Sequence, residues 1–145
     1  MKVKIKKLED RAIIPEYKSE GAAGFDFHAI DSITVPAGRS MKVRTGIAME
    51  IPAGYEVQIR PRSGLSANTS LRVSNSPGTL DSDFRGEIMI LIDNIDQNGA
   101  SSVRIDAGER IAQGVLQKVE QIEFIEVDEL SETERGEGGF GSTGE

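Results

Sequence analysis

Short stretches in which apolar and polar residues alternate recur along the whole chain. Val3 and Ile5 alternate with lysines, and residues 55–60 place apolar side chains at every second position. An alternation with a period of two is typical of a strand that buries one face. Further candidate strands lie at residues 33–35, 40–51, 87–93, 101–105, 111–119 and 122–127.

Turn signals separate these stretches. Pro-Ala-Gly stands at 36–38 and 52–54, and Asp-Ala-Gly stands at 106–108. No segment keeps a helical period over three turns, and the best helix candidate is Ser63–Thr69, of one or two turns. Many short strands without a linker or repeat predict one all-β domain: a sandwich, jelly roll or barrel.

The C-terminal stretch 135–145 differs from everything before it. It contains five glycines together with Arg135, Phe140, Ser142 and Thr143. Bare backbone N–H groups, a cation and two hydroxyls suit a strap around a polyphosphate, and the phenylalanine suits a cap on a flat ring. A disordered glycine-rich tail is the alternative. We expect a domain at 1–134 and a mobile arm at 135–145.

Composition limits the available chemistry. The chain has 145 residues, no cysteine and a single histidine, His28. Thiol nucleophiles, cysteine-ligated zinc and histidine-rich metal sites are therefore disfavoured. No Gly-Lys-Ser/Thr sequence occurs, which excludes a Walker-type phosphate loop. Catalysis must rest on carboxylates, hydroxyls, arginine, lysine or a bound metal ion.

The net charge is −7 and is unevenly distributed. Residues 119–145 hold nine acidic residues and one basic residue, so residues 1–118 carry +1. This charge distribution disfavours nucleic-acid binding, but it is compatible with the binding of a small anionic ligand by a few arginines. The basic start has no apolar h-region and no run reaches membrane-spanning length, so we expect a cytoplasmic protein without membrane contact.

Two segments in the first half of the chain are too specialised for plain turns. Residues 15–26 place a run of small residues, 21–24, shortly before Asp26, where close backbone approach is possible. Residues 60–64 read Arg-Pro-Arg-Ser-Gly at a strand end, which suits phosphate capture. A tight turn and ordinary surface arginines are the alternative interpretations.

Two more segments follow. Residues 74–86 form a long polar loop in which Asp81 follows the apolar Leu80, and we expect partial desolvation to raise its basicity. A turn-forming aspartate is the alternative. Arg110 and Gln113 are three apart and would point to opposite faces of a regular strand. A bend or bulge is needed if both serve one site.

Taken in this order, these four segments and the C-terminal strap resemble the five motifs of the trimeric dUTPase family. The resemblance covers roughly residue 15 to the C-terminus. It implies a jelly-roll-like fold, a homotrimer with active sites shared between subunits, and Mg²⁺ as cofactor. It also implies hydrolysis of dUTP to dUMP and pyrophosphate, which lowers dUTP, excludes uracil from DNA and supplies dUMP for dTMP synthesis.

The resemblance further implies a role for each matching residue. Asp81 looks like the general base that orients water for attack on the α-phosphorus, and Asp26 like a residue that reaches Mg²⁺ through water. Arg62, Ser63, Gly64 and Gln113 are similar to phosphate contacts. Residues that resemble the uracil contacts are Asn75, Gly78, Thr79, Leu80 and the pocket-lining Met89. Residues of the arm that resemble ligand contacts are Arg135, Phe140, Gly141, Ser142 and Thr143.

One position departs from the family pattern. Phe84 stands where tyrosine is usual, and its ring is expected to pack beneath the deoxyribose. Because phenylalanine keeps the flat face, we expect UTP to be rejected still.

Two alternatives remain. A dCTP deaminase of the same fold would need a glutamate context that residues 86–91 lack. A non-catalytic trimeric binding or regulatory module would have kept the scaffold without the chemistry.

Overall fold

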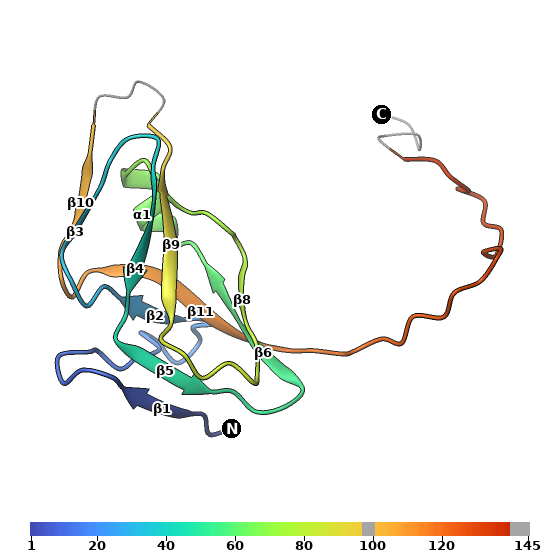
Figure 1. Ribbon diagram of the computed structural model, residues 1–145, viewed down its shortest axis with the longest axis horizontal. Coiled ribbons are helices and arrows are strands. Elements are labelled where there is room, and N and C mark those ends of the chain that lie inside the picture. The colour runs from blue at the N-terminus through green and yellow to red at the C-terminus, as the bar shows by residue number, and fades with distance from the viewer. Residues whose placement is uncertain (97–100, 140–145) are drawn as a thin grey trace.

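The computed structural model describes residues 1–96 and 101–139. Within them the chain forms eleven strands and one short helix, arranged as a β-body from which the C-terminal residues extend away (Figure 1). The elements are β1 Lys4–Lys7, β2 Phe25–His28, β3 Ile33–Val35, β4 Ser40–Arg44, β5 Ile47–Glu50, β6 Tyr55–Arg60, α1 Ser63–Asn68, β7 Leu71–Val73, β8 Gly78–Leu80, β9 Met89–Asn94, β10 Val103–Ile105 and β11 Arg110–Lys118. The all-β prediction and the single short helix are confirmed.

Antiparallel pairing organises the strands into sheets. A four-stranded sheet has the order β2-β11-β6-β8, and a three-stranded sheet has the order β4-β9-β7. Two smaller ladders join β1 to β5 and β10 to β3. Inward residues of both larger sheets share one core, in which Phe27, Ile90, Ile92 and Ile111 are fully buried.

Buried polar groups anchor the exit of α1. Asn94 is 1% exposed and donates its amide hydrogens to the carbonyl oxygens of Val35 and Ser101. Its Oδ1 accepts from the Ser70 hydroxyl at 2.6 Å, two residues after α1 ends. Because the amide is hydrogen-bonded on both sides, its burial fixes the helix against β9.

Three strand predictions need correction. The single strand predicted at 40–51 is two strands, because Gly46 adopts φ +70° and turns the chain between β4 and β5. The strand predicted at 122–127 is not formed, since no other segment of the described chain pairs with it. The short strands β2, β7 and β8 were not predicted: β2 begins and β8 lies inside the segments 15–26 and 74–86, which read as loops, and β7 lies between the helix candidate and the second segment.

Gly46 supplies a stability test. A Cβ there would lie 2.2 Å from Ile30 Cδ1 on top of an unfavourable φ, whereas Gly54, with φ +80°, has nothing within 4 Å. We expect Gly46→Ala to lower the free energy of unfolding by about 2–4 kcal/mol, combining strain and overpacking. Gly54→Ala, with backbone strain alone, should cost about 1–2 kcal/mol. Denaturant unfolding of both variants measures the difference, and equal losses would show that Ile30 moves aside freely.

Candidate active site

Asp26 is held at the surface of β2 by the residues on either side of it. Phe25 and Phe27 point into the core, and their rings stack edge to face at 5.4 Å. Both rings pass close to Gly114 on β11, where a Cβ would lie 2.4 Å from Phe25. The alternation of β2 therefore turns Asp26 to the opposite face, although its side chain is only 13% exposed.

Two arginines from different elements converge on the Asp26 carboxylate. Arg62, which precedes α1, donates from Nε to Oδ1 at 2.9 Å. Arg110, the first residue of β11, donates from Nη1 to Oδ2 at 3.1 Å. Arg62 Nη1 also donates to the Arg110 carbonyl oxygen at 3.1 Å. One carboxylate thus orients two guanidiniums and leaves the group with a net charge of +1.

A β-bulge lets Arg110 and Gln113 share this face. The pairing of β11 with β2 shifts between Arg110, opposite His28, and Ala112, opposite Phe27. Ile111 is the extra residue, so Gln113 comes to lie directly opposite Asp26. The irregularity that the sequence spacing demanded is therefore present.

Gln113 joins the arginine group to the start of α1. Its Nε2 donates to the Pro61 carbonyl oxygen at 2.8 Å. A Cβ at Gly24 would lie 2.8 Å from Gln113 Oε1, so the small residue before Asp26 makes room for the amide. We name Asp26, Arg62, Arg110 and Gln113 the carboxylate–arginine cluster.

His28 borders this cluster. Its pKa lies below the ordinary value, first because of burial; the Asp26 charge opposes the shift, and Lys18, Arg110 and Arg62 add to it. Its Nδ1 is buried, and the described part of the chain gives it no hydrogen-bond partner. The imidazole is therefore neutral at physiological pH beside the two guanidiniums.

Asp81 lies at the other end of the same sheet. It follows β8, whose Leu80 pairs with Val57, while Arg62 lies beyond the opposite end of β6. At about 3.3 Å per residue, the two side chains are separated by roughly 20 Å along the strand direction. Asp81 is exposed and lines a polar cavity of about 560 Å³. The partial desolvation expected from the sequence is therefore not provided by one chain.

The remaining predicted residues surround these two ends. Ser63 and Gly64 open α1 as exposed residues, and Asn75 lies at the turn before Gly78. Thr79 is exposed on β8, and Leu80 is buried beside it. Phe84 and Met89 are about equally exposed, and the Phe84 ring lies over Gly86, where a Cβ would be 2.7 Å from its Cζ.

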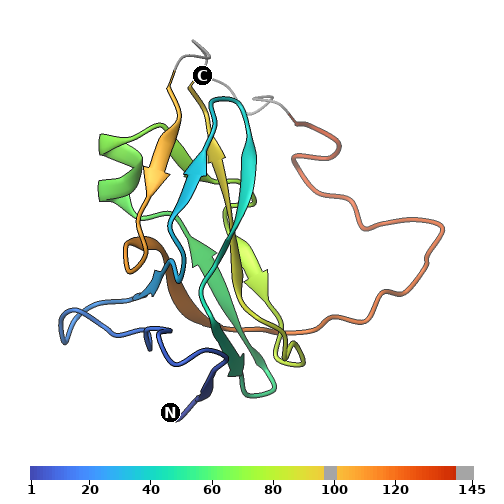
Figure 2. The ribbon, with the colours of Figure 1, turned by 60° about the vertical axis from the view of Figure 1, so that its left-hand side comes forward.

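The C-terminal residues leave the body beside the Asp81 end. Val119 and Gln121 still line the Asp81 cavity, and the described residues after them, 122–139, extend into solvent (Figures 1 and 2). Arg135 makes only a local turn, donating from Nε to the Gly138 carbonyl oxygen at 2.7 Å. The predicted ligands Phe140, Gly141, Ser142 and Thr143 lie outside the described residues.

Comparison with known proteins identifies the family. The dUTPase family model matches residues 10–144. The chain belongs to the dUTPase family. It is 53% identical to a deoxyuridine 5'-triphosphate nucleotidohydrolase of Nautilia profundicola over the full length of both chains. It is 51% identical to the enzyme of the same name from Wolinella succinogenes, covering 100% of this chain and 95% of that one.

A solved dUTPase confirms the fold. The dUTPase of Staphylococcus bacteriophage 80alpha, determined with dUpNHpp, superimposes with a TM-score of 0.90 at 28% identity. The match covers 99% of this chain and 98% of that chain. In the present chain, the one helix among the described residues, α1, is too short and polar to cross a membrane.

Sequence reasoning missed one member of the cluster. The spacing drew attention to Arg110, but the resemblance assigned it no role, whereas the structure places it on Asp26. The signal was the three-residue spacing to Gln113, which only a bulge can accommodate.

The carboxylate–arginine cluster carries a net charge of +1 within one chain and is therefore a candidate anion site. We expect Arg62→Gln to weaken pyrophosphate binding by about 10- to 100-fold, the scale of one hydrogen bond to a charged group. Arg104→Gln is the matched control, because Arg104 pairs with Asp106 at a more exposed position on β10. Isothermal titration calorimetry measures both, and equal affinities would remove the cluster as the anion site.

Proposed function

We propose that this protein hydrolyses dUTP to dUMP and pyrophosphate by attack of water on the α-phosphorus. The observation that carries the proposal is the cluster in which Asp26 orients Arg62 and Arg110 at the start of α1. Family membership and relatives named deoxyuridine 5'-triphosphate nucleotidohydrolase support the substrate. The reaction lowers dUTP and supplies dUMP.

The cluster holds the phosphates. Hydrolysis at a highly charged phosphorus depends more on positioned cations and donors than on a covalent nucleophile. Arg62 and Arg110 supply fixed positive charge, and Ser63, Gly64 and Gln113 add donors beside them. Because Asp26 neutralises one of the two arginines, the site binds the triphosphate without an excess of charge that would retain the product.

Asp81 is the proposed general base. Its exposed carboxylate takes the proton from the attacking water, which lies in line with the leaving pyrophosphate. In one chain Asp81 and Arg62 are at opposite ends of β6, so they cannot act on the same phosphorus. A second subunit must bring its Asp81 to the first subunit's arginines, and the desolvation of Asp81 is then supplied at this interface.

The base and the sugar are read by the segment that contains Asp81. Asn75 and the backbone of Gly78–Leu80 pair with the edge of uracil, and the closeness of Gly78 to the Asn75 amide leaves little space for a 5-methyl group. Phe84 lies beneath the deoxyribose and Met89 lines the pocket. Their exposure in the single chain leaves both free to contact a ligand.

A homotrimer is proposed because residues 122–130, which lie before the arm, have no hydrogen-bond or ion-pair partner among the described residues. Residues 120–130 expose Ile122, Phe124, Ile125 and Leu130, with Phe124 at 87% and Leu130 at 88%. Isolated apolar side chains tolerate water, but such a run marks an interface. The acidic residues between them give residues 120–130 a negative charge.

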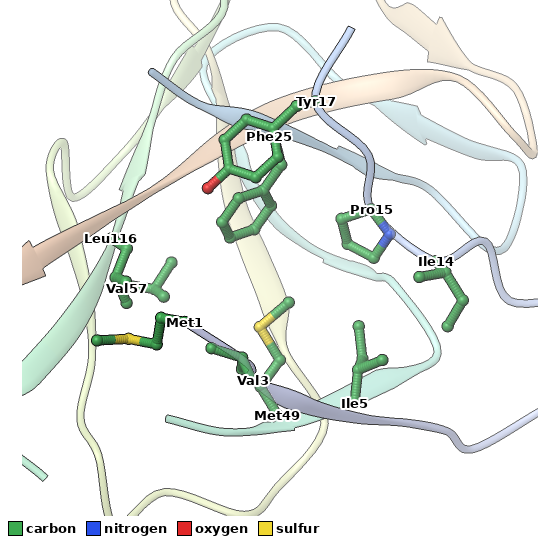
Figure 3. Close-up of a pocket in the computed structure, with 10 residues that line it drawn as sticks. All are labelled: Met1, Val3, Ile5, Ile14, Pro15, Tyr17, Phe25, Met49, Val57 and Leu116. Carbon is green, nitrogen blue, oxygen red and sulfur yellow. The ribbon is translucent and has the colours of Figure 1, made fainter. Parts of the chain in front are cut away.

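The N-terminal strand offers a complementary surface for residues 120–130 of another subunit. β1 pairs with β5 along one edge, and within residues 1–96 and 101–139 its other edge is unpaired. Its lysines alternate with Val3 and Ile5, which line an apolar cavity of about 420 Å³ (Figure 3). An alternating acidic–apolar strand from another subunit matches this edge in charge and in hydrophobicity.

The arm, residues 135–145, is the proposed lid. Arg135, Ser142 and Thr143 bind the γ-phosphate, Gly141 lies between them and Phe140 stacks on uracil. Closure over a complete triphosphate excludes water and favours dUTP over dUMP. The boundary between a domain at 1–134 and an arm at 135–145 belongs to this proposal.

Magnesium is the proposed cofactor, and the described residues fit it as an outer-sphere partner. Among them, no group of three or more metal-ligating side chains comes together. Each Asp26 oxygen accepts one arginine hydrogen bond and keeps a lone pair for a metal-bound water. When bound to the triphosphate, Mg²⁺ supplies positive charge that this acidic chain lacks.

The two alternatives are not favoured. A dCTP deaminase would not match relatives that are named nucleotidohydrolases over the whole chain. A non-catalytic module would have no need for Asp81, Arg62 and Arg110, all of which are present.

We expect Asp81→Asn to lower kcat for dUTP by about 100-fold or more, the scale of a general base. The amide keeps the size of the side chain, so nucleotide binding and assembly should remain. A pyrophosphate-release assay measures turnover, and calorimetry with a non-hydrolysable dUTP analogue measures binding. Turnover within a few-fold of the wild type would exclude Asp81 as the base.

Two truncations separate the role of the arm, residues 135–145, from that of the segment before it. Removal of residues 135–145 should leave a folded trimer with poor activity, because only the lid is lost. Removal of residues 120–145 should also weaken the trimer, because the contact with β1 is lost. Analytical ultracentrifugation and the activity assay read the two effects, and full activity of the shorter truncation would contradict the lid.

Mixing inactive variants tests whether sites are shared. Asp81→Asn and the 135–145 deletion each disable a different part of the site. If the parts come from different subunits, co-refolded mixtures should regain a fraction of wild-type turnover. Complete inactivity of mixed trimers would show that Asp81 and the lid of each site come from the same chain.

A further inference from the structure

Five charged side chains that the proposed reaction does not use meet where β4 ends. Arg44 lies at the centre, with Glu87 from the loop before β9 and the more exposed Glu9, Arg11 and Asp31 around it. We name this group the Arg44 cluster. It connects four segments of the chain that lie far apart in the sequence.

Arg44 donates to three carboxylates. Its Nε lies 3.1 Å from both oxygens of Glu87, and its Nη2 lies 2.5 Å from Glu9 Oε1. Its Nη1 reaches Asp31 Oδ2 at 3.4 Å. The pKa of the Arg44 guanidinium is raised, first by Glu87 and then by Glu9, so its charge is constant over the working pH range.

Glu87 is the least exposed member of the cluster. Its side chain is 14% exposed, compared with 33% or more for the other four. Its Oε1 accepts a further hydrogen bond from the Gly46 N–H at 2.9 Å. Exposed ion pairs contribute little, whereas a shielded carboxylate with several donors holds its position. Glu87 is therefore the fixed point of the loop between β8 and β9.

The anchored segment carries two of the residues proposed to contact the nucleotide. Phe84 precedes Glu87 by three residues, and its ring rests on Gly86. Met89 follows Glu87 by two residues and lies directly opposite Arg44 in the β4–β9 ladder. Between them, Ile88 is fastened by its N–H to the Ile47 carbonyl oxygen and by its own carbonyl oxygen to Thr45.

We propose that Glu87, held by Arg44 and the Gly46 N–H, is a positioning residue for substrate selection. It fixes the backbone from which Phe84 meets the sugar and Met89 meets the base, without touching the nucleotide. This inference rests on the proposed function. It predicts that loosening Glu87 changes which nucleotide is accepted more than it changes the chemical step.

The test measures kcat and KM for dUTP and UTP with Glu87→Ala, Glu87→Gln and Arg44→Lys. With Glu87→Ala we expect KM for dUTP to rise about tenfold, kcat to stay within about threefold, and the preference for dUTP over UTP to fall about tenfold, the effect of a displaced contact residue. Glu87→Gln keeps one acceptor oxygen and should be intermediate. Arg44→Lys keeps the charge but loses the planar guanidinium that contacts several carboxylates at once. It should therefore also raise KM for dUTP and lower the preference for dUTP over UTP.

Arg11→Gln is the matched control. It removes ion pairs to Glu9 and Asp31 from the same cluster and leaves every Glu87 contact in place. Its dUTP preference should equal that of the wild type. If thermal unfolding shows an equal stability loss for Arg11→Gln and Glu87→Gln but only the latter loses selectivity, a general structural role is excluded.

The two proposals fail in different ways. If the wild-type protein releases no pyrophosphate from dUTP, the proposed function fails and this inference fails with it. If the wild type cleaves dUTP and rejects UTP while folded Glu87→Ala, Glu87→Gln and Arg44→Lys keep the same preference, only the positioning role of Glu87 is overturned. A drop in kcat with unchanged KM and preference would also overturn it.

Discussion

The Asp26 carboxylate joins three parts of the fold by accepting one hydrogen bond from Arg62 and one from Arg110. Without it, two guanidiniums on neighbouring elements would repel each other, and Arg110 would lose the one hydrogen bond that directs its side chain among the described residues. The aromatic rings on either side of Asp26 fix β2 against β11, and the bulge at Ile111 brings Arg110 and Gln113 to the same face. The position of the anion site is thus set by core packing, and its charge by one shared carboxylate.

The parts of the fold that depend on local pattern could be predicted. The strand at 55–60, the helix after Arg62 and the turns at Gly38, Gly54 and Gly108 follow from alternation and from glycines with positive φ. The division of 40–51 could not, because Gly46 turns the chain where its lack of a Cβ accommodates the distant Ile30. Arg110 was underestimated for a similar reason, since a bulge is a property of a strand pair and not of one strand.

The failed prediction at 122–127 is informative in another way. The pattern of a strand is present, but a strand exists only when another one accepts its hydrogen bonds. In the single chain that partner is missing, and the same holds for the burial expected at Asp81. Both discrepancies concern residues whose surroundings, on our proposal, are completed by another subunit. On that proposal, the sequence pattern reflects the assembled site, and one chain shows only its two separate halves.

The two halves have different supports, and this separates affinity from selectivity. On our proposal, the phosphate side is carried by β2, β11 and the start of α1, and its charges would bind any polyphosphate. The proposed base and sugar side includes the segment from Asp81 to Met89, which the Arg44 cluster holds against β4. Changes in one support need not disturb the other, because their contacts share no residue. A cell contains many nucleoside triphosphates, so a strong but unselective anion site is useful only if, as we propose, the neighbouring subunit presents a rigid surface that rejects the wrong sugar and base.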